Sequence, residues 1–235
     1  MLQADFAAEA LGRCRLFDGL TGEPLAALTR TLRTRRFRRF RRGEVLFHEG
    51  DPGDALFIVA SGAVKVVVPS EDGEEAILAT LRRGDFLGEL ALLDGAPRSA
   101  SAIALEPTET LALPRDQFRA LVASEPAIRD ALLASLAGEL RRLTTHVAEL
   151  HFLDLTGRLA ARLARLAEEH GDRASDGSVR LDAPLTQSDL AAMIGATRQS
   201  VNKLLGEFEA SGLIRIERDS IVVTSLDALA KAAHR

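Results

Sequence analysis

The sequence has few of the residues that build redox or metal centres. Its 235 residues include one cysteine, Cys14. One cysteine excludes a disulfide within the chain, and also an iron–sulfur cluster held by several of the chain's own thiolates. The five histidines are scattered without a metal-ligand spacing, and no nucleophile–base pair or phosphate loop for hydrolysis is present. We therefore expect no metal, no resident cofactor and no enzymatic activity.

Long apolar segments and a basic excess are also missing. No apolar run reaches about 18 residues, the length that a membrane span needs, and Met1–Asp5 lacks the basic start of a secretory signal. The formal net charge is −4, which is not the bulk signature of a basic nucleic-acid binder. We expect a cytoplasmic protein with no membrane partner, and any affinity for DNA has to come from a local patch.

One segment is strongly basic: in Arg33–Arg42, arginines surround Phe37 and Phe40. Our main interpretation is a solvated face of a strand or turn, because charged side chains stay in water while phenylalanines pack inward. A contact with nucleic acid or RNA polymerase is the weaker alternative for this segment.

Glycines divide the first half of the chain into short apolar runs. Val64–Val68 is β-branched and suits a buried strand, and a turn over 70–73 joins it to the next strand. A last strand is expected over 105–113 and a short helix over 116–123. This rhythm predicts a small antiparallel barrel or jelly roll, with glycines at positions 43, 50, 53, 62, 73, 84, 88 and 95.

The segment 88–100 combines the groups that a phosphorylated sugar requires. Gly88 allows close backbone approach to a ligand because it has no Cβ. Glu89 can accept a hydrogen bond from a ribose hydroxyl, and a short helix that starts there would direct N–H groups at the same anion. Arg98 offers a planar fork of donors for phosphate, and Ser99 adds one more donor.

From Pro126 the apolar period becomes helical. Six apolar residues alternate spacings of three and four, which is the a/d pattern of a coiled coil: Leu133, Leu136, Leu140, Leu143, Val147 and Leu150. We expect them to form a homodimer interface; the alternative is a single amphipathic helix packed on its own barrel. The helical pattern pauses at Asp154, which we expect to cap a new helix that extends as far as Glu168. The polar segment 169–178 is predicted to be a loop.

The segment 186–205 has the pattern of a helix-turn-helix. Thr186 and Asp189 resemble a capping box, Gly195 ends the first helix, and Thr197 can cap the second. The second helix buries Val201, Leu204 and Leu205, and residues 213–223 are expected to form two short strands of a wing. Candidate contacts to DNA are Thr197, Arg198, Gln199, Ser200, Asn202 and Lys203 on the helix, and Arg215 or Arg218 on the wing.

The order of these segments along the chain, from the β-rich segment through the long helix to the helix-turn-helix and wing, makes residues 20–225 resemble the CRP/FNR family of transcription regulators, which includes the catabolite activators. The resemblance implies an α+β fold. A cyclic-nucleotide-binding β-roll would occupy 1–125, a dimerisation helix with its hinge 126–153, and a winged helix-turn-helix 154–235. It also implies that 88–100 is the phosphate-binding cassette, and that RNA polymerase is a partner. Iron–sulfur sensors of the family use several cysteines, so the single cysteine disfavours that type.

The sequence departs from the family at two places. A Thr-Ser pair on the dimer helix of cyclic-AMP receptors reaches the base; ungapped alignment on 152–154 places Leu143 and Thr144 there, and Thr145 is a possible substitute. The recognition helix has Arg198-Gln199 where the family often has Arg-Glu, so the operator is expected to differ at that position.

These observations predict a cyclic-nucleotide-responsive, sequence-specific DNA-binding regulator, with cyclic AMP as first choice and cyclic GMP as second. The alternative is a constitutive regulator of the same family with a vestigial pocket. An enzyme that turns over nucleotide is a remote alternative, because no metal cluster or base for it is present.

Overall fold

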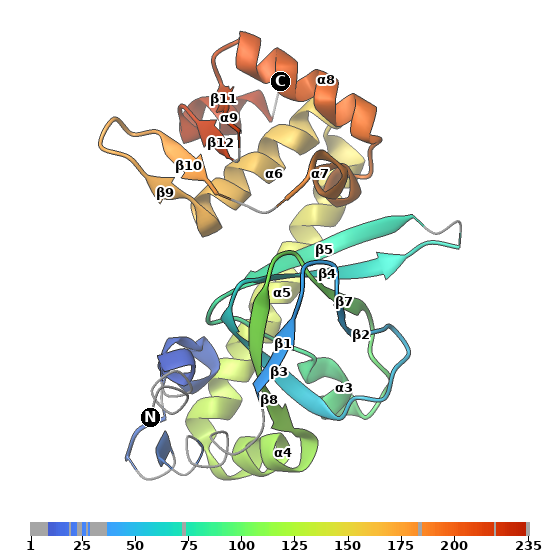
Figure 1. Ribbon diagram of the computed structural model, residues 1–235, viewed down its shortest axis with the longest axis vertical. Helices are drawn as coiled ribbons and strands as arrows, with labels where there is room; N and C mark the ends of the chain where they lie inside the picture. The colour runs from blue at the N-terminus through green and yellow to red at the C-terminus, as the bar shows by residue number, and fades with distance from the viewer. Residues whose placement is uncertain are drawn as a thin grey trace. The chain divides into compact units, whose positions relative to one another are not determined.

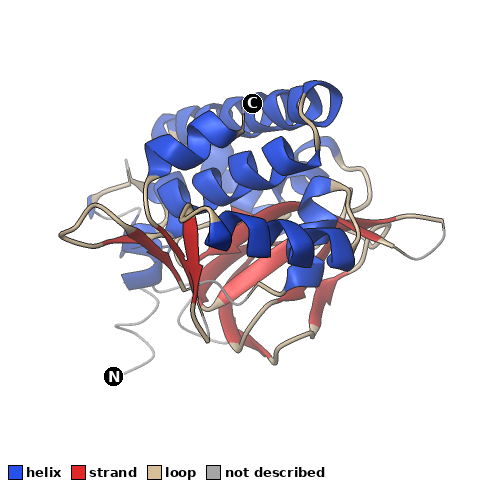
Figure 2. Cartoon of the chain, turned by 90° about the horizontal axis from the view of Figure 1, so that it is seen from above, coloured by secondary structure: helices blue, strands red, loops and turns tan. Residues whose placement is uncertain are grey.

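The computed structural model describes residues 9–18, 20–22, 25–26, 28, 37–71, 74–182, 185–218 and 220–233. The chain divides into two compact units, Met1–Leu140 and Arg141–Arg235. Both units contain helices and strands (Figure 2), which confirms the α+β class. The division falls within the long helix that the sequence places between a ligand domain and a DNA-binding domain.

The first unit is built on two four-stranded antiparallel sheets, with strand orders β1-β8-β3-β6 and β2-β7-β4-β5 (Figure 1). This arrangement confirms the predicted β-roll, and the hairpin β4–β5 confirms the expected strand pair around 70–73. The strands are β1 (Phe37–Phe40), β2 (Val45–Phe47), β3 (Ala55–Ser61), β4 (Ala63–Pro69), β5 (Glu75–Arg82), β6 (Phe86–Leu87), β7 (Ser101–Ala104) and β8 (Thr108–Pro114).

Strand β3 is buried on both faces, because successive side chains point to opposite sides of a strand. Leu56 and Ile58 join one core cluster with residues of β8, α3, α4 and α5, while Phe57 and Val59 join a second cluster with residues of β4 and β7. The second cluster therefore lies between the two sheets. The helices of this unit cover the outer face of the sheet that contains β3.

The first unit also contains helical segments. They include the 3-10 turn η1 (Arg15–Phe17), which precedes the strands, and α3 (Glu89–Asp94), α4 (Arg115–Ser124) and the start of α5 (Pro126–Phe152). The expected last strand was placed three residues too early, since β8 begins at Thr108. Residues 105–107 bend closely around Gly62, where an added Cβ would lie 2.6 Å from the Pro107 carbonyl oxygen. That bend interrupts the apolar run that the sequence shows.

Helix α5 is the long helix that the apolar period predicts, and it ends at Phe152. Ile128 and Leu132 are buried in the core of the first unit, and Leu136 packs against the same cluster. None of the described helices is both long and apolar enough to cross a membrane.

The second unit is a helix-turn-helix with a four-stranded sheet of order β11-β12-β10-β9. Its elements after α5 are α6 (Leu155–His170), β9 (Asp172–Arg173), β10 (Val179–Leu181), α7 (Gln187–Ile194), α8 (Arg198–Ala210), β11 (Ile214–Ile216), β12 (Ile221–Val223) and α9 (Leu226–Ala232). Strands β11 and β12 confirm the expected wing. Helix α9 was not expected from the sequence.

The helix expected from Asp154 through Glu168 is confirmed. Asp154 caps α6, its carboxylate accepting from the backbone N of Gly157, and the helix ends at His170. One local prediction in this unit was wrong. The expected loop 169–178 contains the last residues of α6 and strand β9, which pairs with β10 in a small hairpin.

The arginine run is described from Phe37 onward, and its earlier part lies outside the described residues. Phe37 packs against one core cluster and Phe40 is buried in the other, while Arg38 and Arg39 are exposed. Over the described part, this confirms the interpretation as a solvated strand face. β1 is an edge strand of its sheet, and exposed charges at such an edge oppose pairing with another chain.

Candidate ligand pocket and DNA-binding elements

Gly88 connects β6 to the short helix α3 in a conformation that favours glycine. Its φ is +87°, in the left-handed region that L residues rarely adopt. An added Cβ would lie 2.3 Å from Nη1 of Arg98. A side chain at position 88 is therefore disfavoured twice, by the left-handed backbone conformation and by the position of the Arg98 guanidinium.

Arg98 is the most deeply buried charged residue of this loop, with 3% of its surface exposed. Nη1 donates to the Gly88 carbonyl at 2.6 Å and Nη2 donates to the Ala55 carbonyl at 2.7 Å, with Asp54 Oδ1 at 3.4 Å. The guanidinium lies over the ring of Phe47, with Cζ 4.3 Å from the ring centroid. Burial lowers the pKa of Arg98, and the nearby Asp54 partly opposes this shift.

One nitrogen of Arg98 is left without an acceptor. Nε is buried and has no hydrogen-bond partner among the described residues. A buried donor without a partner costs about 1–3 kcal/mol, and more when the group is charged. The geometry thus holds a guanidinium in place and leaves part of its hydrogen-bonding capacity unused.

The loop that carries Arg98 is fixed to the turn before β3. The Arg98 backbone N donates to the Asp51 carbonyl, and the Gly50 backbone N donates to the Arg98 carbonyl, both at 2.9 Å. Ser99, the next residue, is exposed. The backbone bonds hold this pair in fixed positions, with the arginine directed inward and the serine exposed to solvent.

Glu89 begins α3, which confirms the short helix expected there. Its pKa is raised, first by burial and then by the charge of Glu139 on α5. Arg98 opposes the shift only weakly. A carboxylate in this setting gains from any donor that approaches it, because a hydrogen bond to the charged form offsets the lost hydration.

Thr144 and Thr145, the candidate base contacts, are exposed on α5 in the part of the helix that belongs to the second unit. The Thr145 hydroxyl donates to the Arg141 carbonyl one turn earlier, at 3.1 Å. Leu143 beside them is 44% exposed. The three candidate residues on α5 are exposed to solvent, whereas Arg98 in the segment 88–100 is buried.

The apolar seam of α5 is uncovered along most of its length. Leu136 packs on the core of its own unit, but the other five residues have exposed fractions from 37% to 66%: Leu133, Leu140, Leu143, Val147 and Leu150. Phe152 at the end of the helix is 85% exposed. Packing against the barrel therefore accounts for the first turns of α5 and leaves a stripe of apolar side chains without cover in the single chain.

The helix-turn-helix begins and turns at the expected residues. Thr186 and Asp189 form a reciprocal capping box, and Gly195 ends α7 with φ +66°. The Thr197 side chain caps α8 by accepting from the Ser200 backbone N at 3.2 Å. These caps satisfy the backbone donors that open each helix and fix the turn between them.

The outer face of α8 carries the candidate DNA contacts. Arg198, Gln199, Asn202 and Lys203 are exposed, while Val201 is buried on the opposite face. Two of the candidates already have partners: the Asn202 side chain donates to Gln187 Oε1 at 3.0 Å, and Lys203 lies 3.7 Å from Glu207. The Asn202 bond links α8 to the first turn of α7, so this amide stabilises the motif before any DNA is present.

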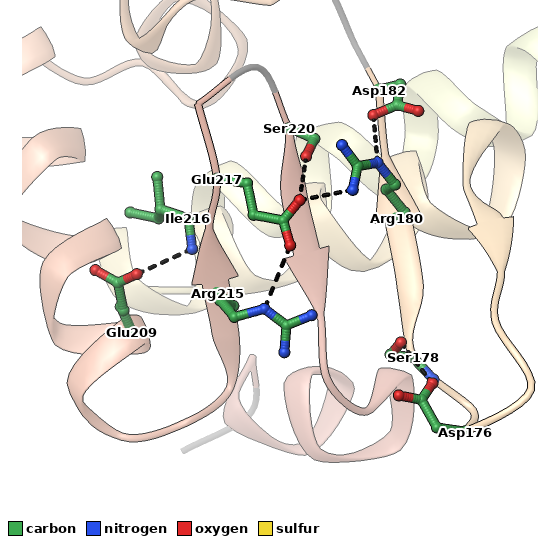
Figure 3. A network of polar contacts seen from close by, with 9 residues as sticks. All are labelled: Asp176, Ser178, Arg180, Asp182, Glu209, Arg215, Ile216, Glu217 and Ser220. Carbon is green, nitrogen blue, oxygen red and sulfur yellow. Dashed lines mark hydrogen bonds and ion pairs between the residues drawn. The ribbon is translucent and has the colours of Figure 1, made fainter.

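The wing carries a network of ion pairs that the sequence did not reveal. Figure 3 shows the Glu217 carboxylate between Arg180 of β10 and Arg215 of β11. Arg180 Nη1 lies 2.6 Å and Arg215 Nε 3.4 Å from this carboxylate, and the Ser220 hydroxyl donates to it at 3.2 Å. Arg218 is exposed. Of the two wing candidates, Arg215 therefore has its charge offset by Glu217.

Arg180 was missed because it stands in a short segment with no motif. Its signal is alternation, since Val179 and Leu181 are buried on either side of it, which is the pattern of a half-buried strand. It also pairs with Asp182 at 2.8 Å. Another link is the Glu209 side chain at the end of α8, which accepts from the Ile216 backbone N at 2.9 Å and joins the helix to the wing.

Comparison with known proteins agrees with both halves of this description. The family model of the cyclic nucleotide-binding domain matches residues 37–125, and that of the Crp-like helix-turn-helix domain matches 157–232. The first match includes the whole segment 88–100, and the second includes α7, α8 and the wing.

Relatives are similar over most of the chain. The CRP-like cAMP-activated global transcriptional regulator of Mycobacterium tuberculosis is 37% identical over 225 residues, covering 96% of this chain and 99% of that protein. The cyclic AMP receptor protein of Thermus thermophilus is 34% identical and covers 82% of this chain and 85% of its own length. The solved structure of a CooA mutant from Carboxydothermus hydrogenoformans superposes with a TM-score of 0.76 at 26% identity, covering 94% and 95% of the two chains. The chain therefore belongs to the CRP/FNR family, as a cyclic-nucleotide-binding and DNA-binding transcription regulator and not an enzyme.

Proposed function

We propose that this regulator is switched by a cyclic nucleotide, with cyclic AMP as first choice, and that it binds an operator in double-stranded DNA as a homodimer. The observation that carries the ligand proposal is Arg98, which is buried, held by two backbone carbonyls and left with an unpaired Nε. The relatives named as cAMP-activated or as a cyclic AMP receptor support the choice of nucleotide.

The cyclic phosphate is proposed to bind Arg98 and Ser99. An anion would offer the guanidinium ionised acceptors in addition to neutral carbonyls, and a phosphate can accept two parallel bonds from an arginine. The ribose hydroxyl is proposed to donate to Glu89, whose carboxylate is partly buried and gains from a donor. Gly88 contributes by leaving Arg98 the space that a side chain would fill.

The base is proposed to contact the dimer helix. Thr144 is the first candidate, and Thr145 can take part only by sharing or releasing its bond to the Arg141 carbonyl. Leu143 has no hydrogen-bonding group, so the pair of polar contacts typical of cyclic-AMP receptors is reduced here. Cyclic GMP is therefore the second candidate ligand, because the base contact discriminates between the two purines.

The uncovered stripe on α5 is proposed to be the dimer interface. Its residues repeat at the coiled-coil period, and two copies of a helix with this pattern bury the stripe against each other. The stripe consists of Leu133, Leu140, Leu143, Val147 and Leu150, with Leu136 at its edge against the core.

The DNA contacts are proposed to come from the exposed face of α8 and from the wing. Arg198 suits guanine O6 and N7, Gln199 suits adenine, and Lys203 can serve either guanine or phosphate. Thr197, Ser200 and Asn202 are proposed to contact the backbone, as is Arg218 of the wing. A twofold dimer places its two recognition helices about 34 Å apart, in successive major grooves.

The ligand is proposed to act by population shift. It favours one arrangement of the two DNA-binding units only if it binds that arrangement more tightly than the other. RNA polymerase remains an expected partner on family grounds. The arginines of β1 are the weaker candidate for such a contact, and unchanged promoter activity after Arg38→Glu with Arg39→Glu would exclude it.

A DNA-binding titration with no nucleotide, with cyclic AMP and with cyclic GMP tests the proposal directly. We expect weak operator binding without nucleotide and tighter binding with cyclic AMP, measured by fluorescence anisotropy at fixed salt. Equal, tight binding in all three would support a constitutive regulator with a vestigial pocket. Calorimetry with each nucleotide identifies the ligand, and the absence of heat with both would contradict the gated mechanism.

A further inference from the structure

A second pocket lies within the second unit, where the last turns of α5 meet α6 and α7. His146 and Glu149 line it from α5, Arg158 and Arg162 from α6, and Met193 from α7. Its volume is about 10 Å³, which is room for one guest of the size of a water molecule. This pocket has no part in the nucleotide site or in the DNA-binding face proposed above.

Most charged groups around this pocket are satisfied by the protein. Arg158 donates to the Leu150 and Leu153 carbonyls at 2.7 and 3.0 Å, and so pairs the carbonyls that end α5. Glu149 forms an ion pair with Arg165, and His146 Nδ1 lies 3.7 Å from its other oxygen. Burial alone would raise the pKa of Glu149, but His146 and Arg165 outweigh it and lower this pKa.

Arg162 is the exception. It is 8% exposed, and among the described residues its one hydrogen bond runs from Nε to the Met193 sulfur at 3.2 Å. A thioether is a weak acceptor, and a guanidinium has five N–H donors to satisfy. Burial and the charge of Arg165 lower the pKa of Arg162, and the carboxylates of Glu169 and Glu149 oppose this shift only in part. A buried charge that is incompletely compensated is costly, and a further counter-ion would reduce that cost.

The surrounding charge selects the guest. Two arginines, Arg158 and Arg162, line the pocket with one carboxylate, Glu149, and that carboxylate already has Arg165 as its partner. A water molecule could fill the space but would neutralise none of the excess positive charge. We propose that this pocket binds a monatomic anion such as chloride against Arg162, linking the end of α5 to α6 and α7 within the second unit.

The proposal predicts a specific dependence of stability on chloride. A ligand that binds only the folded state raises the unfolding midpoint with its concentration. We would measure thermal unfolding of the full chain at fixed ionic strength while chloride replaces gluconate. The wild-type midpoint is expected to rise with chloride, and Arg162→Met is expected to show no such rise.

Two comparisons separate this effect from general salt effects. Arg173→Met removes an exposed arginine of β9 and is expected to keep the wild-type response. In gluconate alone, Arg162→Met is expected to unfold at or above the wild-type temperature, because an apolar side chain replaces a buried, poorly paired charge. A chloride response of equal size in wild type and Arg162→Met would overturn the proposal, as would a flat response in wild type.

A measurement on the unmodified protein keeps the test independent of any variant. Crystals grown with bromide are expected to show an anomalous peak beside the guanidinium of Arg162. Density for water alone at that position would contradict the proposal. A bound phosphate there, with no response to halide, would show that the guest is a polyatomic anion and that the proposed class is wrong.

Discussion

The two units place their recognition groups in opposite environments. In the first, Arg98 is buried, bonded to carbonyls and covered by Phe47. In the second, Arg198, Gln199 and Lys203 stand in water on one face of α8. A small ligand has few atoms, so its site gains most from a desolvated charge; DNA presents many phosphates, and a solvated face can match them at little cost. The comparison predicts large, salt-insensitive effects in the pocket and smaller, salt-sensitive ones on the DNA face.

The largest effect is expected from Arg98→Leu. Truncating one partner of a buried charge-assisted contact costs about 2–5 kcal/mol, which is roughly 30-fold to several thousand-fold in Kd. Nucleotide affinity should fall by this factor in calorimetry, while the dimer and its nucleotide-free DNA binding persist. A fully responsive Arg98→Leu protein would refute the assignment of the pocket.

A smaller loss is expected from Gly88→Ala, in stability and in nucleotide affinity together. The variant adds backbone strain of about 1–3 kcal/mol and pushes a Cβ against the Arg98 guanidinium. Gly95→Ala is the matched control, because Gly95 has φ +82° with no atom within 4 Å of an added Cβ. If both variants lower Tm and nucleotide affinity equally, the effect of Gly88→Ala comes from backbone strain alone, and contact of the added Cβ with Arg98 does not contribute to it.

Glu89→Gln is expected to remove one carboxyl group's contribution to the pH dependence of the free energy of unfolding. The pKa of Glu89 is raised in the folded state, so the folded protein holds its proton more strongly than the unfolded chain does. This group therefore contributes stability at low pH, and the contribution is lost as pH rises through the folded pKa. The variant should flatten that decline in urea unfolding and should bind nucleotide more weakly. If the pH dependence of the unfolding free energy is the same in wild type and variant, protonation of Glu89 is not coupled to folding.

On the DNA face, Arg198→Ala is expected to cost about 1–3 kcal/mol in operator affinity and to relax the preference at one base pair. Because this face is solvated, the affinity of both proteins should fall with salt, with a shallower slope for the variant if Arg198 also contacts phosphate. The control is Arg173→Ala on β9. If the operator affinity of the wild-type protein does not change with salt, the interpretation of α8 as a solvated, electrostatic DNA-binding face is wrong.

The smallest effect is expected at the surface pair Arg39–Glu109, which joins β1 to β8 at 2.7 Å. The Arg39 side chain is 79% exposed, and such pairs contribute less than about 1 kcal/mol. A double-mutant cycle with alanine at both positions should find this coupling and lose it in high salt. A coupling above 2 kcal/mol would mean that exposure is a poor guide to effect size in this protein.

Where the sequence carried a local physical signal, the fold could be predicted. The capping box of Thr186 and Asp189, the left-handed Gly195 and the cap at Thr197 all act within one turn, so their residues identify them directly. The heptad spacing located α5 in the same way. Strand β9 gave no comparable signal, because two polar residues become ordered only through packing in the folded unit. Helix α9 has such a signal in the cap at Ser225, which accepts from the Ala228 backbone N, and the sequence prediction overlooked it.

The site was predictable in its chemistry but not in its contacts. Gly88, Glu89, Arg98 and Ser99 could be chosen because a sugar phosphate needs their groups. That Arg98 lies over Phe47 and bonds Ala55 depends on residues more than 40 positions away, which no spacing reveals. Glu217 and Arg162 were missed for the same reason: their partners Arg180 and Met193 lie 37 and 31 positions away along the chain.

The raised pKa of Glu89 also has a calorimetric consequence. If the ribose hydroxyl donates to the ionised carboxylate, nucleotide binding in mildly acidic solution must release a proton into the buffer. The measured heat then includes the ionisation enthalpy of that buffer, and titrations in phosphate and in Bis-Tris at the same pH should differ. The difference between the two heats would thus measure the proton that Glu89 releases on nucleotide binding, without any label or substitution.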